Sequence, residues 1–338
     1  MKFLVTLIIS TLLGVGVYKH SEPKIIFEAE DDYVTDVLLA LGENYDDIMP
    51  NFNIANVSVQ AGETLVKDGF AQKENGGKGK RQSKHFVCTS CHNLQIEDPD
   101  LTVSSPEARL SYVSEKGLPF LQGTTLYGAI NRTSFYNGDY YKKYGELVET
   151  ARHDIRNAIQ LCATECAQGR ALEPWEMESI MAYFWDIGFR MSDLDLNEKE
   201  RERIKNASSD EEKLYARELI KSKYLSGSPA TFVPPPADRN VGTGLSGNYE
   251  SGKKIYELSC LHCHLQERYS FFDLEKNNMS VDFLRNKMAT YSSYSIYQVI
   301  RWGVPSYSGR TSYMPQYPLE KLSDQQLADL REFLEKGY

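Results

Sequence analysis

The sequence predicts a mainly α-helical protein made of two similar domains. The chain has 338 residues, a length that suggests two ordinary domains with extra segments. Few stretches alternate strictly between apolar and polar residues, whereas several carry the three-to-four-residue spacing of amphipathic helices. One short motif also occurs twice, at residues 88–92 and 260–264, each time after a helix-like stretch. This repetition indicates that the two domains share a plan.

The N-terminal residues 1–20 have the pattern of an export signal. Lys2 supplies one positive charge, and a short apolar run follows at residues 3–17. That run is short for a membrane span, but the cleavage site is weak, and an uncleaved anchor therefore stays open as an alternative. We expect an exported, periplasmic protein, either free or held at the inner membrane by its leader.

Residues 21–55 form an acidic segment. The net charge of the chain is −9, and between Glu22 and Asp47 nine acidic residues face one lysine. The remainder of the chain is almost neutral, which argues against a nucleic-acid-binding face. We expect the acidic segment to be a solvated, poorly packed stalk, and the alternative is a docking strip for a basic partner.

Residues 56–195 form the first predicted domain. Gly62 lies in a helix-like stretch before the first copy of the motif. Pro174 suits the first turn of a later helix, and an apolar stripe follows it at Met177, Ile180, Met181, Phe184 and Ile187. Between the motif and this helix lie the tyrosine-rich residues 136–144, which we expect to cover a buried group.

Residues 196–246 connect the domains, and residues 247–338 form the second domain. Residues 197–224 are dense in charge and predict an exposed helix, whereas the prolines and glycines of residues 226–248 predict an extended linker. In the second domain Gly252 precedes the motif. The S-x-x-Q sequence of residues 323–326 fits a capping box, and the final helix then carries one apolar face with Leu327, Leu330 and Leu334.

The repeated motif is C-x-x-C-H, which attaches c-type haem. In the first copy Cys88 and Cys91 would bond to the haem vinyl groups, and His92 would be the proximal iron ligand. In the second copy the same roles fall to Cys260, Cys263 and His264. A helix before the motif and one after it is the plan of class I cytochrome c. We therefore expect two covalently bound c-type haems, one in each domain.

A zinc site or a thioredoxin-like redox pair is the alternative interpretation of a C-x-x-C sequence. A single zinc site built from both copies would need them side by side, yet the copies lie far apart in the sequence. Neither copy lies in a βαβ pattern. Export agrees with the haem interpretation, because c-type haem is attached outside the cytoplasm.

A haem iron that does not bind substrate needs a sixth ligand. In the second domain Met314 precedes the final helix, and its thioether would give the His/Met ligation that suits electron transfer. Met279 and Met288 compete for this role, although Met288 lies in a helix predicted at residues 281–290, where core packing explains it. His262, inside the motif, should point away from the iron towards the surface.

In the first domain Cys162 is the candidate distal ligand, as a thiolate that would anchor ferric iron. Cys162 and Cys166 lie four positions apart on a helix expected to start near Glu149. A disulfide between them is the alternative in an oxidising compartment, although that bond would strain a helical turn. Three further candidates are better explained as surface or core residues, namely His153, Met177 and Met181.

The segment around Cys162 resembles a known family. Cys162, then Gly169-Arg170 and residues 175–178 with Tyr183 beyond, is similar to the dihaem thiosulfate dehydrogenases and the related haem subunit of the Sox thiosulfate-oxidising system. The resemblance covers residues 56–195 and 247–338. It implies a cysteine distal ligand seven positions before a glycine, a spacing that Cys162 keeps and Cys166 does not.

These patterns predict a dihaem cytochrome that passes electrons to a redox partner protein in a periplasmic or membrane-associated respiratory chain. The alternative is a thiosulfate dehydrogenase-like oxidoreductase that acts on a small sulfur anion at the first haem, with Cys162 in the catalytic position. Several cationic residues could attract such an anion, although the lysine run is typical of a solvated loop: Lys78, Lys80, Arg81, Lys84 and Arg132. A dihaem peroxidase is a third class, for which the sequence carries no specific signature.

Overall fold

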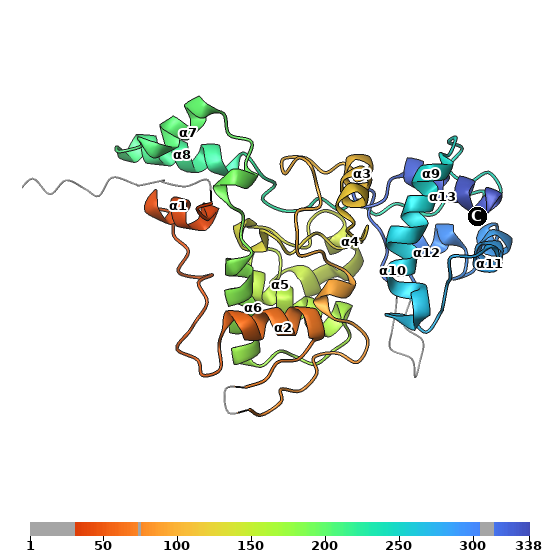
Figure 1. Ribbon diagram of the computed structural model, residues 1–338, viewed down its shortest axis with the longest axis horizontal. Helices are drawn as coiled ribbons and strands as arrows, with labels where there is room; N and C mark the ends of the chain where they lie inside the picture. The colour runs from red at the N-terminus through yellow and green to blue at the C-terminus, as the bar shows by residue number, and fades with distance from the viewer. Residues whose placement is uncertain (1–30, 74–75, 305–313) are drawn as a thin grey trace, which may run out of the picture.

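The computed structural model describes residues 31–73, 76–304 and 314–338, which form helices joined by irregular segments (Figure 1). Within these ranges the β-pairing is limited to isolated bridges, such as that between Val304 and Met314. The predicted mainly α-helical class is therefore confirmed. The predicted leader at residues 1–20 lies outside the described residues. Among the helices that are described, none is both long enough and apolar enough to cross a membrane.

Two helix pairs repeat one packing arrangement. Helix α2 (Val59–Asp68) packs on α6 (Pro174–Asp186), and α9 (Tyr249–Ile255) packs on α13 (Asp324–Lys336). A Cβ atom on Gly62 would lie 1.9 Å from the backbone oxygen of Ser179, and one on Gly252 would lie 1.9 Å from that of Asp329. Both crossings are thus close enough to require glycine. We call the parts built on these pairs the N-terminal and C-terminal modules.

The second helix of each pair, α6 and α13, begins where the sequence predicts. Helix α6 begins at Pro174, and α13 begins after Ser323, whose side chain accepts a hydrogen bond from the backbone of Gln326 while Gln326 reaches back. The capping box at residues 323–326 is therefore confirmed. The predicted apolar faces are buried, including Met181 and Phe184 on α6 and Leu327, Leu330 and Leu334 on α13.

The described part of the acidic segment, residues 31–55, contains a packed helix and is not stalk-like there. Helix α1 (Val34–Ala40) buries Val34 and Leu38 completely against a separate core that it shares with α7 (Glu198–Lys205) and α8 (Asp210–Lys221). These three helices lie together at one end of the molecule, away from the C-terminal module (Figure 1). Residues 31–55 therefore differ from the expectation of a poorly packed segment.

The charged segment at residues 197–224 forms two helices rather than one. Helix α7 ends before Asn206, and Ser209 caps α8 through a hydrogen bond from the backbone of Glu212. Ile204 and Ile220 face the α1 core and are fully buried. The basic side chains of α8 also meet the acidic segment, since Lys221 Nζ lies 2.7 Å from Glu43 Oε1. Each segment looks exposed in the sequence because it is rich in charge. In the fold, the acidic and basic side chains of the two segments pair with each other.

The remaining elements are short. The N-terminal part contains η1 (Cys88–Ser90), α3 (Pro106–Lys116), η2 (Ala129–Asn131), α4 (Tyr140–Tyr144), η3 (Gly145–Val148), α5 (Ile155–Leu161), η4 (Cys162–Cys166) and η5 (Met191–Asp193). The C-terminal module adds η6 (Tyr256–Cys260), α10 (Leu261–His264), η7 (Leu265–Glu267), α11 (Asn278–Met288) and α12 (Ile296–Trp302). Two of these, η4 and η6, are π-helices, and each ends at a cysteine. The helix expected near Glu149 begins at Ile155, because Asp154 provides its N-cap.

The core of the C-terminal module includes residues from the first predicted domain. Leu110 and Val113 on α3, with the following Phe120, pack into the same cluster as Tyr256. The backbone N–H of Phe120 also donates to the oxygen of Leu258 at 3.0 Å. The two modules are therefore joined by a shared apolar core as well as by the helix-free segment at residues 225–248.

Candidate functional site

The first C-x-x-C-H motif holds its histidine in one defined orientation. The cysteines lie on and just after the 3-10 turn η1, and His92 Nδ1 lies 2.6 Å from the backbone oxygen of Thr124. Because a carbonyl oxygen can only accept, Nδ1 carries the proton and donates it. The other ring nitrogen, Nε2, therefore keeps its lone pair. This is the arrangement in which a histidine binds a metal, with the hydrogen bond on the second nitrogen fixing the ring.

Close packing fixes the same ring from the side. A Cβ atom on Gly123 would lie 2.6 Å from ring atoms of His92 and 2.5 Å from the backbone oxygen of Cys91. The N–H of Gly123 also donates to that oxygen at 3.0 Å. Burial lowers the pKa of His92, which favours the neutral ring that ligation requires.

The second motif repeats this arrangement. His264 Nδ1 lies 2.6 Å from the backbone oxygen of Phe272, and burial again lowers the pKa of the ring. Here too the carbonyl requires the proton on Nδ1 and leaves Nε2 available. The backbone acceptors, Thr124 and Phe272, could not be identified from the sequence, because any residue can supply a carbonyl oxygen.

An apolar cavity of about 180 Å³ adjoins the second motif. It is lined by Cys260, Cys263 and His264, and also by Met314, which is paired through its backbone to Val304 at 2.8 and 3.0 Å. The competing methionines lie elsewhere, since Met279 is 83% exposed on α11 and Met288 is buried in the core. The fold thus brings the four predicted residues of the second site to one cavity. Aromatic and aliphatic side chains make up most of its remaining wall.

The two motifs lie against each other. Cys263 Sγ lies 3.9 Å from the backbone oxygen of Ser90, inside the first motif, and Cys91 lines the cavity of the second site. His262 is packed against the backbone of Thr89 and Ser90, and burial lowers its pKa to about 4. His262 is therefore half-buried rather than fully exposed, because the opposite motif packs against it.

The same contact removes the sequence-separation argument against a shared zinc site. The fold brings the copies together although they lie far apart in the chain. In the described ranges, no group of three or more His, Cys, Asp or Glu side chains is arranged to hold a metal ion. Instead, each histidine stays with its own cysteine pair, and the cavity at the second pair is predominantly apolar.

Cys162 and Cys166 face the first motif. They occupy the π-helix η4, and the thiol of Cys162 is hydrogen bonded to the side chain of Cys166 and interacts electrostatically with Cys88 and Cys91. The hydrogen bond with Cys166 and burial both raise the pKa of Cys162. All six cysteines of the chain are free thiols, so the disulfide considered from the sequence is not formed.

The tyrosine-rich segment covers this pair of thiols. Tyr136 is hydrogen bonded to Cys166, its ring meets that of Tyr140 edge-on at 5.4 Å, and Tyr140 stacks on Tyr144 at 6.0 Å. Lys143 interacts electrostatically with Cys166, and its ammonium group donates to Gln316 Oε1 in the loop that follows Met314. The segment therefore connects the Cys162 side of the first site with the Met314 side of the second.

None of the other sequence candidates lines the cavity of the second site. His153 is exposed, whereas Met177 and Met181 are buried on α6, and Met181 belongs to the apolar cluster against which Cys88 packs. The cationic loop is solvated, with Lys78, Lys80, Arg81 and Lys84 all exposed. Arg132 is held inside the protein, where it donates to the backbone oxygen of Thr125 at 2.8 Å.

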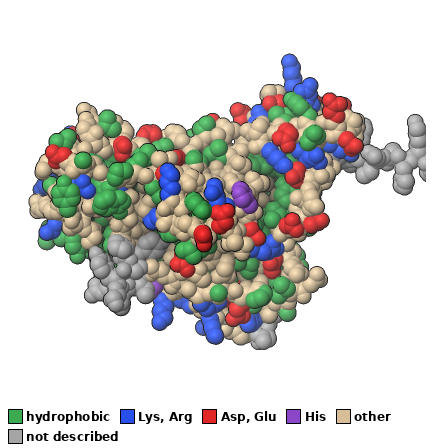
Figure 2. All heavy atoms as spheres, turned by 180° about the vertical axis from the view of Figure 1, so that it is seen from behind, with side chains coloured by type: hydrophobic (Ala, Val, Ile, Leu, Met, Phe, Trp, Pro, Cys, Tyr) green, Lys and Arg blue, Asp and Glu red, His purple; other side chains and the backbone are tan. Residues whose placement is uncertain are grey.

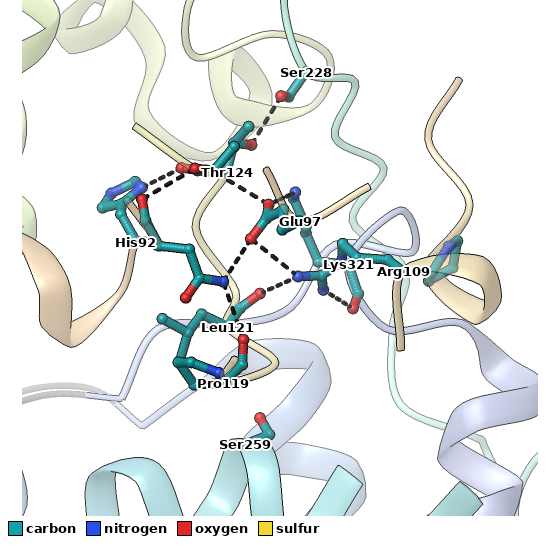
Figure 3. A network of polar contacts seen from close by, with 12 residues as sticks. His92, Glu97, Arg109, Pro119, Leu121, Thr124, Ser228, Ser259 and Lys321 are labelled. Carbon is teal, nitrogen blue, oxygen red and sulfur yellow. Dashed lines mark hydrogen bonds and ion pairs between the residues drawn. The ribbon is translucent and has the colours of Figure 1, made fainter. Parts of the chain in front are cut away.

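A buried charge cluster that the sequence did not reveal supports the first site (Figure 3). Glu97 is fully buried, and its carboxylate accepts from Lys321 Nζ at 3.0 Å and pairs with Arg109 at 3.6 Å. The carboxylate also accepts from the backbone N–H of Thr125 at 3.0 Å and from Asn93 Nδ2 at 2.8 Å. Thr125 directly follows Thr124, whose backbone carbonyl accepts the hydrogen bond from His92. The cluster thus connects α3 and the C-terminal module to the backbone that orients the first histidine.

Comparison of the chain with protein families, with curated proteins and with solved structures gives no match. The class of site is therefore argued from geometry. Each site combines two thiols, one neutral histidine whose Nε2 is unprotonated and, nearby, one further sulfur from Cys162 or Met314. Thiols, imidazole and thioether are the donors that hold c-type haem and its iron.

Proposed function

We propose that this chain is a dihaem c-type cytochrome that transfers electrons in a periplasmic or membrane-associated respiratory chain. The observation that carries the proposal is the matched state of His92 and His264, each with Nδ1 at 2.6 Å from a backbone carbonyl and Nε2 free. Two independent C-x-x-C-H sequences, each with its histidine in the ligating tautomer, are difficult to explain by chance.

The residues around the second motif fit a haem. Cys260 and Cys263 would bond to the vinyl groups, and His264 and Met314 would be the axial ligands, all from the wall of one apolar cavity. In the N-terminal module Cys88, Cys91 and His92 have the same roles, with Cys162 as the distal ligand. A bound c-type haem supplies a one-electron redox centre. The chain orients the ligands and excludes water from them.

The contact between the motifs gives electrons a short route from one site to the other. Ser90 and Cys263 belong to different motifs yet touch at 3.9 Å. An external partner would dock at the second site, where Phe271 and Tyr294 line the cavity and are 55% and 49% exposed. Hydrophobic side chains gather over the C-terminal module on the face drawn in Figure 2. Exposed aromatic groups at a redox edge suit brief association with another electron carrier.

Mass spectrometry of the denatured protein tests the proposal. The chain, produced with c-type haem maturation, should carry two haem additions. Replacing both Cys88 and Cys91 by serine should remove one addition, whereas the matched Cys166→Ser variant should retain both. A wild-type chain that carries one haem or none refutes the dihaem assignment.

A thiosulfate dehydrogenase-like activity at the first site is the second candidate. It is favoured by the position of Cys162 beside Cys88 and Cys91, and by the ammonium group of Lys143 near Cys166, which could attract a sulfur anion. Thiosulfate should then reduce the ferric protein. Cys162→Ala should abolish that reduction together with the low-spin thiolate signal, and Cys166→Ala should preserve the signal. Absence of reduction by thiosulfate in the wild type excludes this candidate.

A further inference from the structure

The geometry points to Cys162 and Cys166 as a reversible dithiol/disulfide pair that exchanges two electrons with the two haem irons. This inference rests on the proposed function, because the irons are the electron acceptors. It assigns a role to Cys166, which the resemblance to thiosulfate dehydrogenases does not explain. It also reconciles the two interpretations of Cys162: the residue would be a ligand in the dithiol state and a disulfide partner in the oxidised state.

The two thiols already touch without being bonded. The side chains of Cys162 and Cys166 are hydrogen bonded to each other, and both cysteines are free thiols. Formation of a bond between them therefore needs no movement of a distant segment, only a small approach of two neighbouring sulfur atoms.

The backbone around the pair can adjust to such a bond. The π-helix η4 is the last turn of its helix, closed by hydrogen bonds from Ala167 N to Cys162 O at 2.8 Å and from Gly169 N to Ala163 O at 2.9 Å. Gln168 then turns the chain out of the helix with a φ of 50°. A strained turn in the middle of a helix would break several hydrogen bonds, whereas a terminal turn disturbs few.

The surroundings favour reaction between these two thiols over reaction with other molecules. Tyr136, Tyr140 and Tyr144 interact with the pair and shield it. The ammonium group of Lys143 also lies near Cys166. On the other side lie Cys88 and Cys91, the sulfurs that would carry the first haem.

The reaction balances with two one-electron acceptors. The S–H bonds of Cys162 and Cys166 break, one S–S bond forms, and two protons leave to water. The two electrons would pass to the two ferric haems that the C-x-x-C-H motifs would hold, one electron to each. In the disulfide state Cys162 would no longer be available as a thiolate ligand. The reverse reaction restores the dithiol and both ferric irons.

An anaerobic titration of the full haem-loaded chain tests the inference. The protein is reduced with dithiothreitol and dithionite, desalted, and oxidised with ferricyanide until the haem spectrum is fully ferric. It is then denatured in guanidinium chloride at neutral pH in the presence of N-ethylmaleimide. Wild type should consume two oxidising equivalents more than the Cys166→Ser and Cys162→Ser variants. Its Cys162–Cys166 peptide should be unalkylated after oxidation and doubly alkylated before it.

Each failure has a separate meaning. The redox pair is overturned if wild type and Cys166→Ser consume equal amounts of oxidant, or if the two thiols remain alkylatable in the ferric protein. Either result stands even when mass spectrometry counts two haems. A Cys162–Cys166 disulfide that dithiothreitol does not reduce in the native protein also overturns the inference, because such a disulfide is structural. A haem count other than two refutes the proposed function, and alkylation after ferricyanide still reports whether the thiols pair.

Discussion

Replacing Glu97 by glutamine tests the charge cluster that joins the modules. In the wild type the buried carboxylate balances the ammonium of Lys321 at 3.0 Å and the guanidinium of Arg109 at 3.6 Å. Glutamine keeps the size and can still accept from the backbone of Thr125, but it removes the negative charge. Two buried cations then face each other, with Asp98 as the nearby carboxyl group that remains.

The expected loss of unfolding free energy is about 3–5 kcal/mol, the range for breaking a buried ion pair by removing one partner. The pKa of Glu97 gives a second route to this figure. Burial alone would raise that pKa, but Lys321 and Arg109 outweigh burial and lower it from 4.5 to about 2. A depression of this size corresponds to about 3 kcal/mol of stability at neutral pH. The two figures agree.

The sign of the pH dependence follows from the depressed pKa. The contribution of Glu97 is fully present above pH 4.5, the ordinary pKa, and is lost as the pH falls towards about 2. The stability difference between wild type and Glu97→Gln should therefore shrink through this window.

Urea unfolding of the haem-loaded protein, followed by circular dichroism, measures these differences. A double variant, Glu97→Gln with Lys321→Met, removes one of the two stranded cations and should regain part of the loss. Glu332→Gln, which breaks the exposed pair with Lys336 at 2.7 Å, serves as the matched control and should cost about 1 kcal/mol or less. If the double variant is no more stable than Glu97→Gln, uncompensated charge is not the cause and the reasoning fails.

Three further predictions concern packing and ligation. Gly252→Ala should destabilise the C-terminal module by about 1–3 kcal/mol or more, because the new methyl group collides with the Asp329 backbone; an unchanged thermal midpoint would contradict the close crossing. Leu38→Ala should cost about 2–5 kcal/mol in urea unfolding, whereas a negligible loss would mean that α1 is not packed in solution. Met314→Ala should abolish the weak sulfur-to-iron band at the red end of the ferric spectrum, and Met279→Ala should leave it intact; the opposite result would reassign the ligand.

The sequence predicted those parts of the molecule whose physics is local. Ser323 and Gln326 predict the start of α13, and Pro174 predicts the start of α6, because capping and proline geometry depend on a few neighbouring residues. The C-x-x-C-H motifs are equally local. Each contains the thiols and the histidine of one candidate site within five positions.

The parts that the sequence missed depend on contacts between distant segments. Glu97 and Lys321 are far apart in the chain, and neither has a local pattern that marks it as buried. His262 looks like a surface residue until Thr89 and Ser90 are placed over it. The tyrosine-rich segment was recognised as a cover, but its contact with Cys166 depends on how η4 is wound.

The contact of Ser90 with Cys263 has a consequence for how redox titrations of this protein should be read. With the two proposed haems bound at motifs that touch, the irons would interact through the low dielectric of the protein interior, so oxidation of one would make oxidation of the other harder. The two steps of a potentiometric curve would then belong to the pair of irons together, as the two pKa values of a carboxylate dyad belong to the dyad. A potential assigned to one haem by deleting the other would therefore differ from the value that haem has in the intact chain.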